Sequence, residues 1–190
     1  MADDNSLPAA LAADLDGTFE AVVLAFQDRL YAFALRLTGS PGDAREIVQD
    51  ALVRAYRALR GYPADRRRTL ALRPWLYRIT LNVTRNRGRA RRRVTLPLDV
   101  LGTDGHPEPP ADAADRPEAR LLGAERRRVL ARLLAGLPDR YRAAVVLRHV
   151  HGLGYAEVAA ILGQPVGTAK ANVHRGLGLL RTALIKEDTT

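Results

Sequence analysis

The 190-residue sequence contains no cysteine, and it has only one tryptophan and one methionine. Without cysteine the chain has no disulfide framework, no thiolate metal site and no cysteine nucleophile. Any response of this protein to redox conditions must therefore come from a partner.

Long apolar runs and strand-like patterns are also lacking. No stretch approaches the roughly 18 apolar residues of a membrane span. The acidic start Met-Ala-Asp-Asp is unlike a signal peptide. We therefore expect a cytoplasmic protein without membrane insertion. Valine, isoleucine and threonine form no alternating runs, whereas apolar residues recur at spacings of three and four, which predicts an all-α fold.

The charge balance is strongly basic. The formal net charge is +9 and the isoelectric point is near 10.7. A polyanion is the expected partner, and both nucleic acid and an anionic membrane surface fit this charge.

A change of composition divides the chain. Residues 94–117 are acidic and rich in proline, which is typical of a flexible linker. We therefore expect two small helical domains, at 1–93 and 118–190, joined by this linker. The predicted helices cover residues 17–37, 44–59, 75–89, 118–134, 139–149, 155–162 and 166–185, with Asp43 as the cap of the second helix and a basic loop at 61–72.

Residues 152–175 have the pattern of a helix-turn-helix. Gly163 suits a turn with positive φ, and Gly167 with Thr168 suits the start of a second helix. Cations and hydrogen-bond donors on the outside of that helix suit a DNA major groove. A plain helical hairpin with a solvated charged face is the alternative. The 100° period places Ala169, Val173, Leu177 and Leu180 inward, and Lys170, His174 and Arg175 outward.

Residues 85–93 form an arginine run downstream of Trp75 and Tyr77. Like charges at this density repel one another, and a polyanion relieves that repulsion. Aromatic rings beside cations suit opened nucleic acid, because bases stack on the rings. For Trp75, ordinary packing in the core is an equally good interpretation.

Two basic helical units joined by an acidic linker resemble the extracytoplasmic-function (ECF) sigma factors of the bacterial sigma-70 family. The resemblance covers almost the whole chain. In the first unit it rests on residues 30–44, on Ile-Val-Gln-Asp at 47–50 and on Arg-Pro-Trp-Leu-Tyr-Arg-Ile-Thr-Leu-Asn at 73–82. In the second unit it rests on residues 137–142, 147–148, 152–155, 157–159, 167–168 and 174–175.

The resemblance implies a role for each unit. The first would be a region 2-like domain that docks on core RNA polymerase and recognises and melts the minus-10 element. The second would be a region 4-like domain that recognises the minus-35 element of promoter DNA. The implied residues are Gln49, Asp50 and Arg54 for docking, Trp75, Asn82, Arg85, Asn86 and Arg89 for the minus-10 strand, and Gly167, Thr168, Lys170, Asn172, His174 and Arg175 for the minus-35 duplex.

The resemblance also implies partners. These are the clamp of the largest polymerase subunit, the polymerase flap and an anti-sigma factor. The acidic linker would either mimic nucleic acid inside the polymerase channels or act as a spacer.

Two other functions are compatible with parts of the sequence. A stand-alone helix-turn-helix regulator, which binds DNA without polymerase, would account for residues 137–185 but not for residues 47–50 or 73–93. An enzyme would need a reactive site, and the pair His149 and His151 has no third metal ligand at motif spacing. We therefore expect no catalytic residue, no metal and no cofactor.

Overall fold

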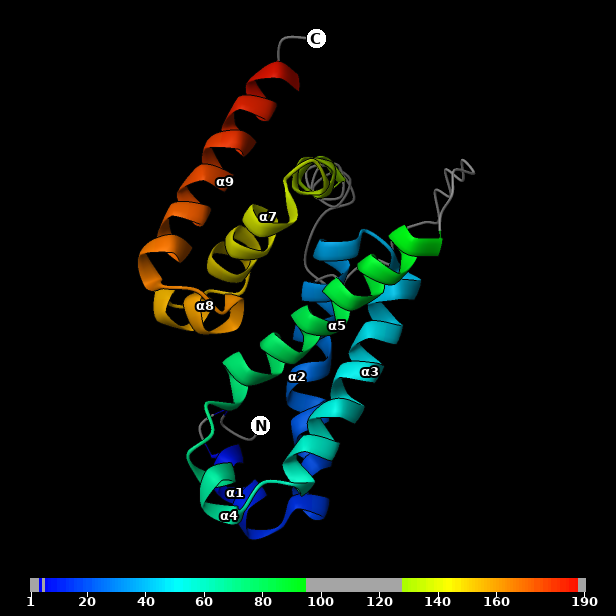
Figure 1. The fold of residues 1–190 in the computed structure, drawn as a ribbon, viewed down its shortest axis with the longest axis vertical. Helices are drawn as coiled ribbons and strands as arrows, with labels where there is room; N and C mark the ends of the chain where they lie inside the picture. Colours follow the sequence, from blue (N-terminus) through cyan, green and yellow to red (C-terminus); the bar gives the residue numbers. More distant parts are fainter. Residues whose placement is uncertain (1–3, 5, 95–127, 188–190) are drawn as a thin grey trace, which may run out of the picture.

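The computed structural model describes residue 4, residues 6–94 and residues 128–187. All regular structure in these ranges is helical, as predicted (Figure 1). Apart from Val94, which ends a helix, the expected linker lies outside the described residues. The helices are α1 (Leu7–Ala13), α2 (Leu15–Thr38), α3 (Pro41–Arg60), α4 (Ala64–Arg68), α5 (Leu72–Val94), residues 128–135, α7 (Asp139–Val145), the π-helical turn η1 (Val146–Val150), α8 (Tyr155–Leu162) and α9 (Val166–Glu187). None of them combines the length and apolarity needed to cross a bilayer.

The first unit is built around the three long helices α2, α3 and α5, which pack against one another (Figure 1). Their apolar stripes follow the predicted helical period, and each stripe faces the other two helices. Burial of this apolar surface is the main force that holds the unit together. Its core includes Phe26, Leu30 and Phe33 from α2, Ile47, Ala51 and Ala55 from α3, and Leu76 and Leu81 from α5.

Two short helices were not predicted from the sequence. Helix α1 buries Leu7 and Leu11 and lies against α2 and α4 (Figure 1). Helix α4 occupies residues that we expected to form a basic loop, and its own residues are all at least partly exposed. Both helices are too short to show a clear period, so their stability comes from tertiary contacts.

The start of α3 differs from the prediction. Its cap is Ser40, whose hydroxyl accepts a hydrogen bond from the backbone N–H of Asp43 at 3.3 Å. Pro41 occupies the first turn, where a missing N–H costs nothing. The expected cap Asp43 is instead buried inside the helix, where its carboxylate forms an ion pair with Arg87 of α5 at 3.1 Å.

The second unit contains the predicted helix-turn-helix. Helix α8 ends at Gly163, which has φ of 67°, and α9 begins three residues later. Ala169, Val173 and Leu180 are buried as expected. Leu177 was also expected to be buried, but it is 40% exposed. The inward position beside it belongs to Gly176, where a Cβ atom would lie only 2.5 Å from Cγ2 of Val145.

The helix before α8 does not continue as a regular α-helix. Residues Asp139–Val145 are α-helical, but Val146–Val150 widen into a π-helical turn that ends at His151. Gly152 then takes a φ of 65°. We call His151 and Gly152, with the end of η1, the His151 corner.

The two units contact each other in this structure. Helix α5 lies against α8, and α2 touches α7 and η1. Arg142 of α7 donates a hydrogen bond to the backbone carbonyl of Leu37 at the end of α2, at 2.7 Å. At the other end of the contact, the His151 corner lies on α2 and α5.

Candidate nucleic-acid interface

The exposed side of α9 begins at its N-terminus. Gly167, Thr168, Lys170, His174 and Arg175 are all exposed there, as expected from the helical period. The first backbone N–H groups of a helix have no intrahelical partner and suit a phosphate. This end of α9 therefore offers amide donors and cations on one surface.

Lys170 and Arg148 approach the same aromatic ring. The Lys170 Nζ atom lies 5.5 Å from the ring centroid of Tyr155, and the Arg148 Cζ atom lies 4.8 Å from it. These cation–π contacts limit the freedom of both side chains. Tyr155 was not among the expected site residues, although its place at the start of α8 brings it beside the exposed end of α9.

Asn172, which was expected to contact DNA, does not lie on the exposed surface. It is 8% exposed, and its Nδ2 atom donates a hydrogen bond to Oε1 of Gln164 at 3.2 Å. This bond joins α9 to the turn that precedes it. Asn172 therefore supports the helix-turn-helix from within.

The second exposed surface lies on α5. Asn82, Arg85, Asn86 and Arg89 are exposed, and their spacing of three, four and seven residues places them on one face of the helix. Nη2 of Arg89 donates a hydrogen bond to Oδ1 of Asn86 at 2.9 Å. Partial burial and the nearby charge of Arg89 lower the pKa of Arg85. We call these four residues the α5 polar face.

Arg87 belongs to the same arginine run but points to another helix. Its Nε atom lies 3.1 Å from Oδ1 of Asp43, and its Nη2 atom forms a further ion pair with Glu46. The hydrogen bond with Glu46 is the main cause that raises the pKa of Arg87. Arg87, a member of the arginine run, is thus ion-paired with two residues of α3.

Trp75 is half-buried and packs against the core, as the packing interpretation predicted. Its ring centroid lies 6.1 Å from that of Tyr62, and the Arg66 guanidinium lies 3.8 Å from the Tyr62 centroid. Both residues belong to the predicted basic loop at 61–72, but neither was singled out from the sequence. The available signal was an aromatic residue just before the basic segment of residues 64–68.

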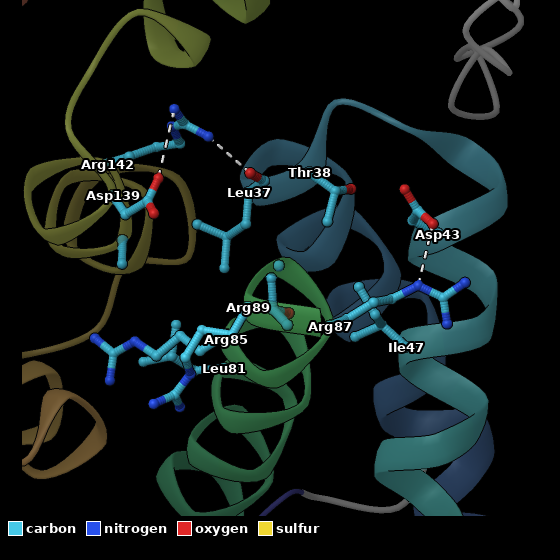
Figure 2. A pocket seen from close by; sticks show the side chains of 13 residues that line it. Leu37, Thr38, Asp43, Ile47, Leu81, Arg85, Arg87, Arg89, Asp139 and Arg142 are labelled. Carbon is cyan, nitrogen blue, oxygen red and sulfur yellow. Dashed lines mark hydrogen bonds and ion pairs between the residues drawn. The ribbon is translucent and has the colours of Figure 1, made fainter. Parts of the chain in front are cut away.

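A groove of about 660 Å³ separates α5 from α7 and from the turn between α2 and α3. Figure 2 shows Arg85, Arg87 and Arg89 on one side of it and Asp139 with Arg142 on the other. The charged residues of its lining are four arginines, Arg85, Arg87, Arg89 and Arg142, and two carboxylates, Asp43 and Asp139, and the other lining residues are uncharged.

The expected docking residues lie on α3. Gln49 and Arg54 are exposed, and Asp50 is partly exposed. The Asp50 carboxylate accepts two hydrogen bonds from Arg54, from Nε at 2.8 Å and from Nη2 at 2.9 Å. The hydrogen bond to Asp50 raises the pKa of Arg54. Exposed pairs of this kind add little to stability, so both groups are free to exchange partners.

His149 and His151 do not share a site. His149 is exposed, whereas the His151 ring packs edge-on against Phe33, with centroids 5.6 Å apart. Within the described ranges, no group of three or more histidine, aspartate and glutamate side chains has the arrangement of a metal site.

Two helical modules, each with an exposed helix face of cations and amides, are typical of the class of nucleic-acid-binding proteins. Family comparisons identify the modules separately. Residues 22–94 match the model of sigma-70 region 2, and residues 127–180 match that of sigma-70 region 4.

Individual relatives match most of the chain. It is 32% identical to the ECF RNA polymerase sigma factor SigW of Bacillus subtilis, over 87% of this chain and 88% of the relative. It is also 32% identical to the ECF RNA polymerase sigma-E factor of Escherichia coli K12, over 83% of this chain and 81% of the relative.

Solved structures agree with these matches. CnrH in complex with the cytosolic domain of CnrY superposes with a TM-score of 0.67 and 26% identity, over 97% of this chain and 98% of that chain. The sigma factor RpoE of Bartonella quintana, in complex with the anti-sigma factor NepR, gives a TM-score of 0.68 and 25% identity, over 87% and 96%. The chain belongs to the ECF sigma factors of the sigma-70 family.

Proposed function

We propose that this ECF sigma factor directs core RNA polymerase to promoters through two separate helix faces, one in each module. The observation that carries the proposal is the pair of exposed surfaces: the α5 polar face and the N-terminal surface of α9. They lie within the segments that match regions 2 and 4 respectively. The division at 1–93, 94–117 and 118–190 is part of this proposal.

In the second module, the N-terminal surface of α9 binds the minus-35 duplex. The backbone amides at Gly167 and Thr168, with Lys170, hold phosphate groups. Arg175 lies further along the exposed side and reads a base edge, because a guanidinium can bind guanine with two hydrogen bonds. His174 is a second exposed donor on this surface.

In the first module, the α5 polar face binds the opened minus-10 strand. Asn82 and Asn86 present amide groups to base edges, and Arg85 and Arg89 pair with phosphates. Trp75 is half-buried, so it serves mainly as the platform on which Tyr62 rests. A base that stacks near this platform would meet the Tyr62 ring and the Arg66 guanidinium together.

Docking on core polymerase uses α3. Gln49 is exposed for contact with the clamp of the largest subunit, and the Asp50–Arg54 pair opens to exchange partners across that interface. The second module reaches the flap. An anti-sigma factor is a further partner, by analogy with the relative that was solved with NepR. The protein acts in the cytoplasm and carries out no catalytic step of its own.

The alternative function is that of a stand-alone helix-turn-helix regulator. The two functions differ in their need for polymerase. We expect the purified chain alone to leave promoter DNA unshifted in a gel, and we expect transcription to begin when core polymerase is added. A specific shift by the chain alone, with no transcription upon addition of core, would favour the stand-alone regulator.

A further inference from the structure

The contact between the two modules centres on one histidine. The Tyr77 hydroxyl and Nδ1 of His151 lie 2.8 Å apart and share a hydrogen bond. Nη2 of Arg73 donates a hydrogen bond to the backbone carbonyl of His151 at 2.5 Å. Phe33 and Tyr77 are fully buried, and both pack edge-on against the imidazole ring. The His151 corner therefore packs on an aromatic face of the first module.

This contact suits only the neutral imidazole. Nε2 of His151 is buried and has no hydrogen-bond partner among the described residues. In an imidazolium this atom would be a charged N–H group without a partner, and burying such a group costs more than burying the neutral ring. The charged groups around the ring are cations: Arg73 from α5, and Arg29 and Arg36 from α2. Burial and these arginines lower the pKa of His151 to about 4.

Among the described residues, only Arg29 of these three arginines forms an ion pair with a carboxylate. Asp4 forms an ion pair with Arg29, and Glu157 of α8 accepts a hydrogen bond from the backbone N–H of Gly154. On the element that carries the corner, Arg148 lies over Tyr155 and His149 is exposed. Tyr77 stays neutral, because burial raises its pKa to about 12.

The contact also holds the two proposed DNA surfaces close together. Elements about 10 and 35 base pairs upstream are about 85 Å apart on straight DNA, at 3.4 Å per base pair. Helices α5 and α9 both contact α8. At 1.5 Å per residue, Arg89 lies about 26 Å along α5 from Leu72, and Arg175 lies about 14 Å along α9 from Val166. In this arrangement the two surfaces cannot span both elements.

We propose that the His151 corner is a latch: it closes the two modules on each other while His151 is neutral, and it must open before both promoter elements are bound. The statement that the latch must open before promoter binding rests on the proposed function. The statement that neutral His151 closes the two modules on each other concerns the free chain alone. The latch is closed above the ordinary pKa of histidine and weakens as the pH falls below that value. His151 has its ordinary pKa in the open form and a lowered pKa in the closed form, so protonation favours the open form.

The size of this effect follows from the two pKa values. With an ordinary value near 6.5 in the open form and about 4 in the closed form, the ratio of closed to open molecules falls about 30-fold between pH 7.5 and pH 5. Loss of the Tyr77 hydroxyl in Tyr77→Phe should lower the same ratio about fivefold at pH 7.5. Closed and open molecules are therefore closer to equal in number in Tyr77→Phe than in the unaltered chain.

The experiment uses the full chain, whose lack of cysteine allows selective labelling. Dyes on Leu24→Cys and Arg181→Cys, both exposed, report the distance between the modules by single-molecule energy transfer. We expect the fraction of molecules with low energy transfer to increase from pH 7.5 to pH 5, and to increase more in Tyr77→Phe. Circular dichroism should show that the helix content does not change. His151→Asn should abolish the pH response, and His149→Asn should retain it.

Two results would overturn the latch. One is a distance that does not change with pH in either background, and the other is a response that persists in His151→Asn. Added core polymerase should separate the dyes at pH 7.5. If core starts transcription while the dyes stay close, the latch is wrong although the proposed function holds. If core does not bind, the proposed function fails, and the pH response of the free chain still decides whether neutral His151 closes the two modules on each other.

Discussion

The two helices that carry the proposed DNA contacts are organised differently. On α5, the exposed residues occupy one face, because the buried residues, such as Leu76 and Leu81, lie on the opposite side. On α9 the buried residues also form one stripe, at Ala169, Asn172, Val173, Gly176 and Leu180, but this stripe includes an asparagine. The asparagines of α5 are exposed, whereas Asn172 of α9 is buried. Helical position indicates exposure on both helices, but residue type alone misplaces Asn172.

The strongest test of this contrast on the DNA side is Arg175→Ala. If Arg175 reads a base, its loss should weaken promoter binding by about 1 to 3 kcal/mol and relax discrimination at one minus-35 position. The matched variant Lys170→Ala should weaken binding to all sequences and reduce the salt dependence by about one unit. Transcription from minus-35 variants at two salt concentrations measures both effects. A uniform loss for Arg175→Ala, with unchanged preference, contradicts base reading.

The packing of α9 predicts opposite effects at two nearby glycines. In Gly176→Ala, the new Cβ would lie 2.5 Å from Cγ2 of Val145 and 3.3 Å from Cβ of Tyr141. We expect this overpacking to lower the free energy of unfolding by about 1 to 2 kcal/mol. In Gly178→Ala the Cβ meets nothing within 4 Å, so stability should rise by up to about 1 kcal/mol. Denaturant titration followed by circular dichroism compares the two. Equal effects would mean that α9 does not approach α7 this closely.

On α5, the comparison is between neighbouring arginines. Arg87→Ala removes one ion-pair partner of the buried Asp43 carboxylate, and we expect it to lower the free energy of unfolding by about 1 kcal/mol. Arg85→Ala should leave stability within about 0.5 kcal/mol and weaken binding to minus-10 single strands. Thermal melting and a single-strand binding assay separate the two roles. If the Arg87→Ala protein is as stable as the unaltered chain and binds single strands more weakly, Arg87 contacts DNA and its structural role is contradicted.

The smallest expected effect concerns the asparagines. Asn172→Ala loses the hydrogen bond to Gln164 and should cost about 0.5 to 1 kcal/mol of stability without changing minus-35 preference. Asn86→Ala should leave melting unchanged and reduce minus-10 discrimination. Melting curves and promoter-variant transcription provide the readouts. Altered minus-35 preference in a normally stable Asn172→Ala protein would show that this side chain reaches DNA.

Helical period and turn residues predicted most of the fold. The predicted helix at 155–162 matches α8, and the one at 166–185 differs from α9 only at its end. The predicted cap of α3, Asp43, was wrong by three residues. Ser40 and Asp43 are both suitable cap residues, and only the buried ion pair of Asp43 with Arg87 distinguishes them. Helix α1 escaped prediction because its burial depends on α2 and α4.

The candidate site was predictable only in part. Exposure of Lys170, His174 and Arg175 follows from helical position alone. The partner of Asn172 lies across a turn, and the partners of Arg87 lie on another helix. A single sequence gives no signal for such tertiary pairs. The position of His151 against Tyr77 depends on how the two modules meet, which no local pattern records.

The most direct test of the account is transcription with core polymerase over a library in which both promoter elements vary independently. We predict that alanine variants of the α5 polar face change the preferred sequence only at the minus-10 element. Variants of Arg175 and His174 should change it only at the minus-35 element. If variants on one helix change preference at both elements, or at neither, the assignment of one promoter element to each module is contradicted.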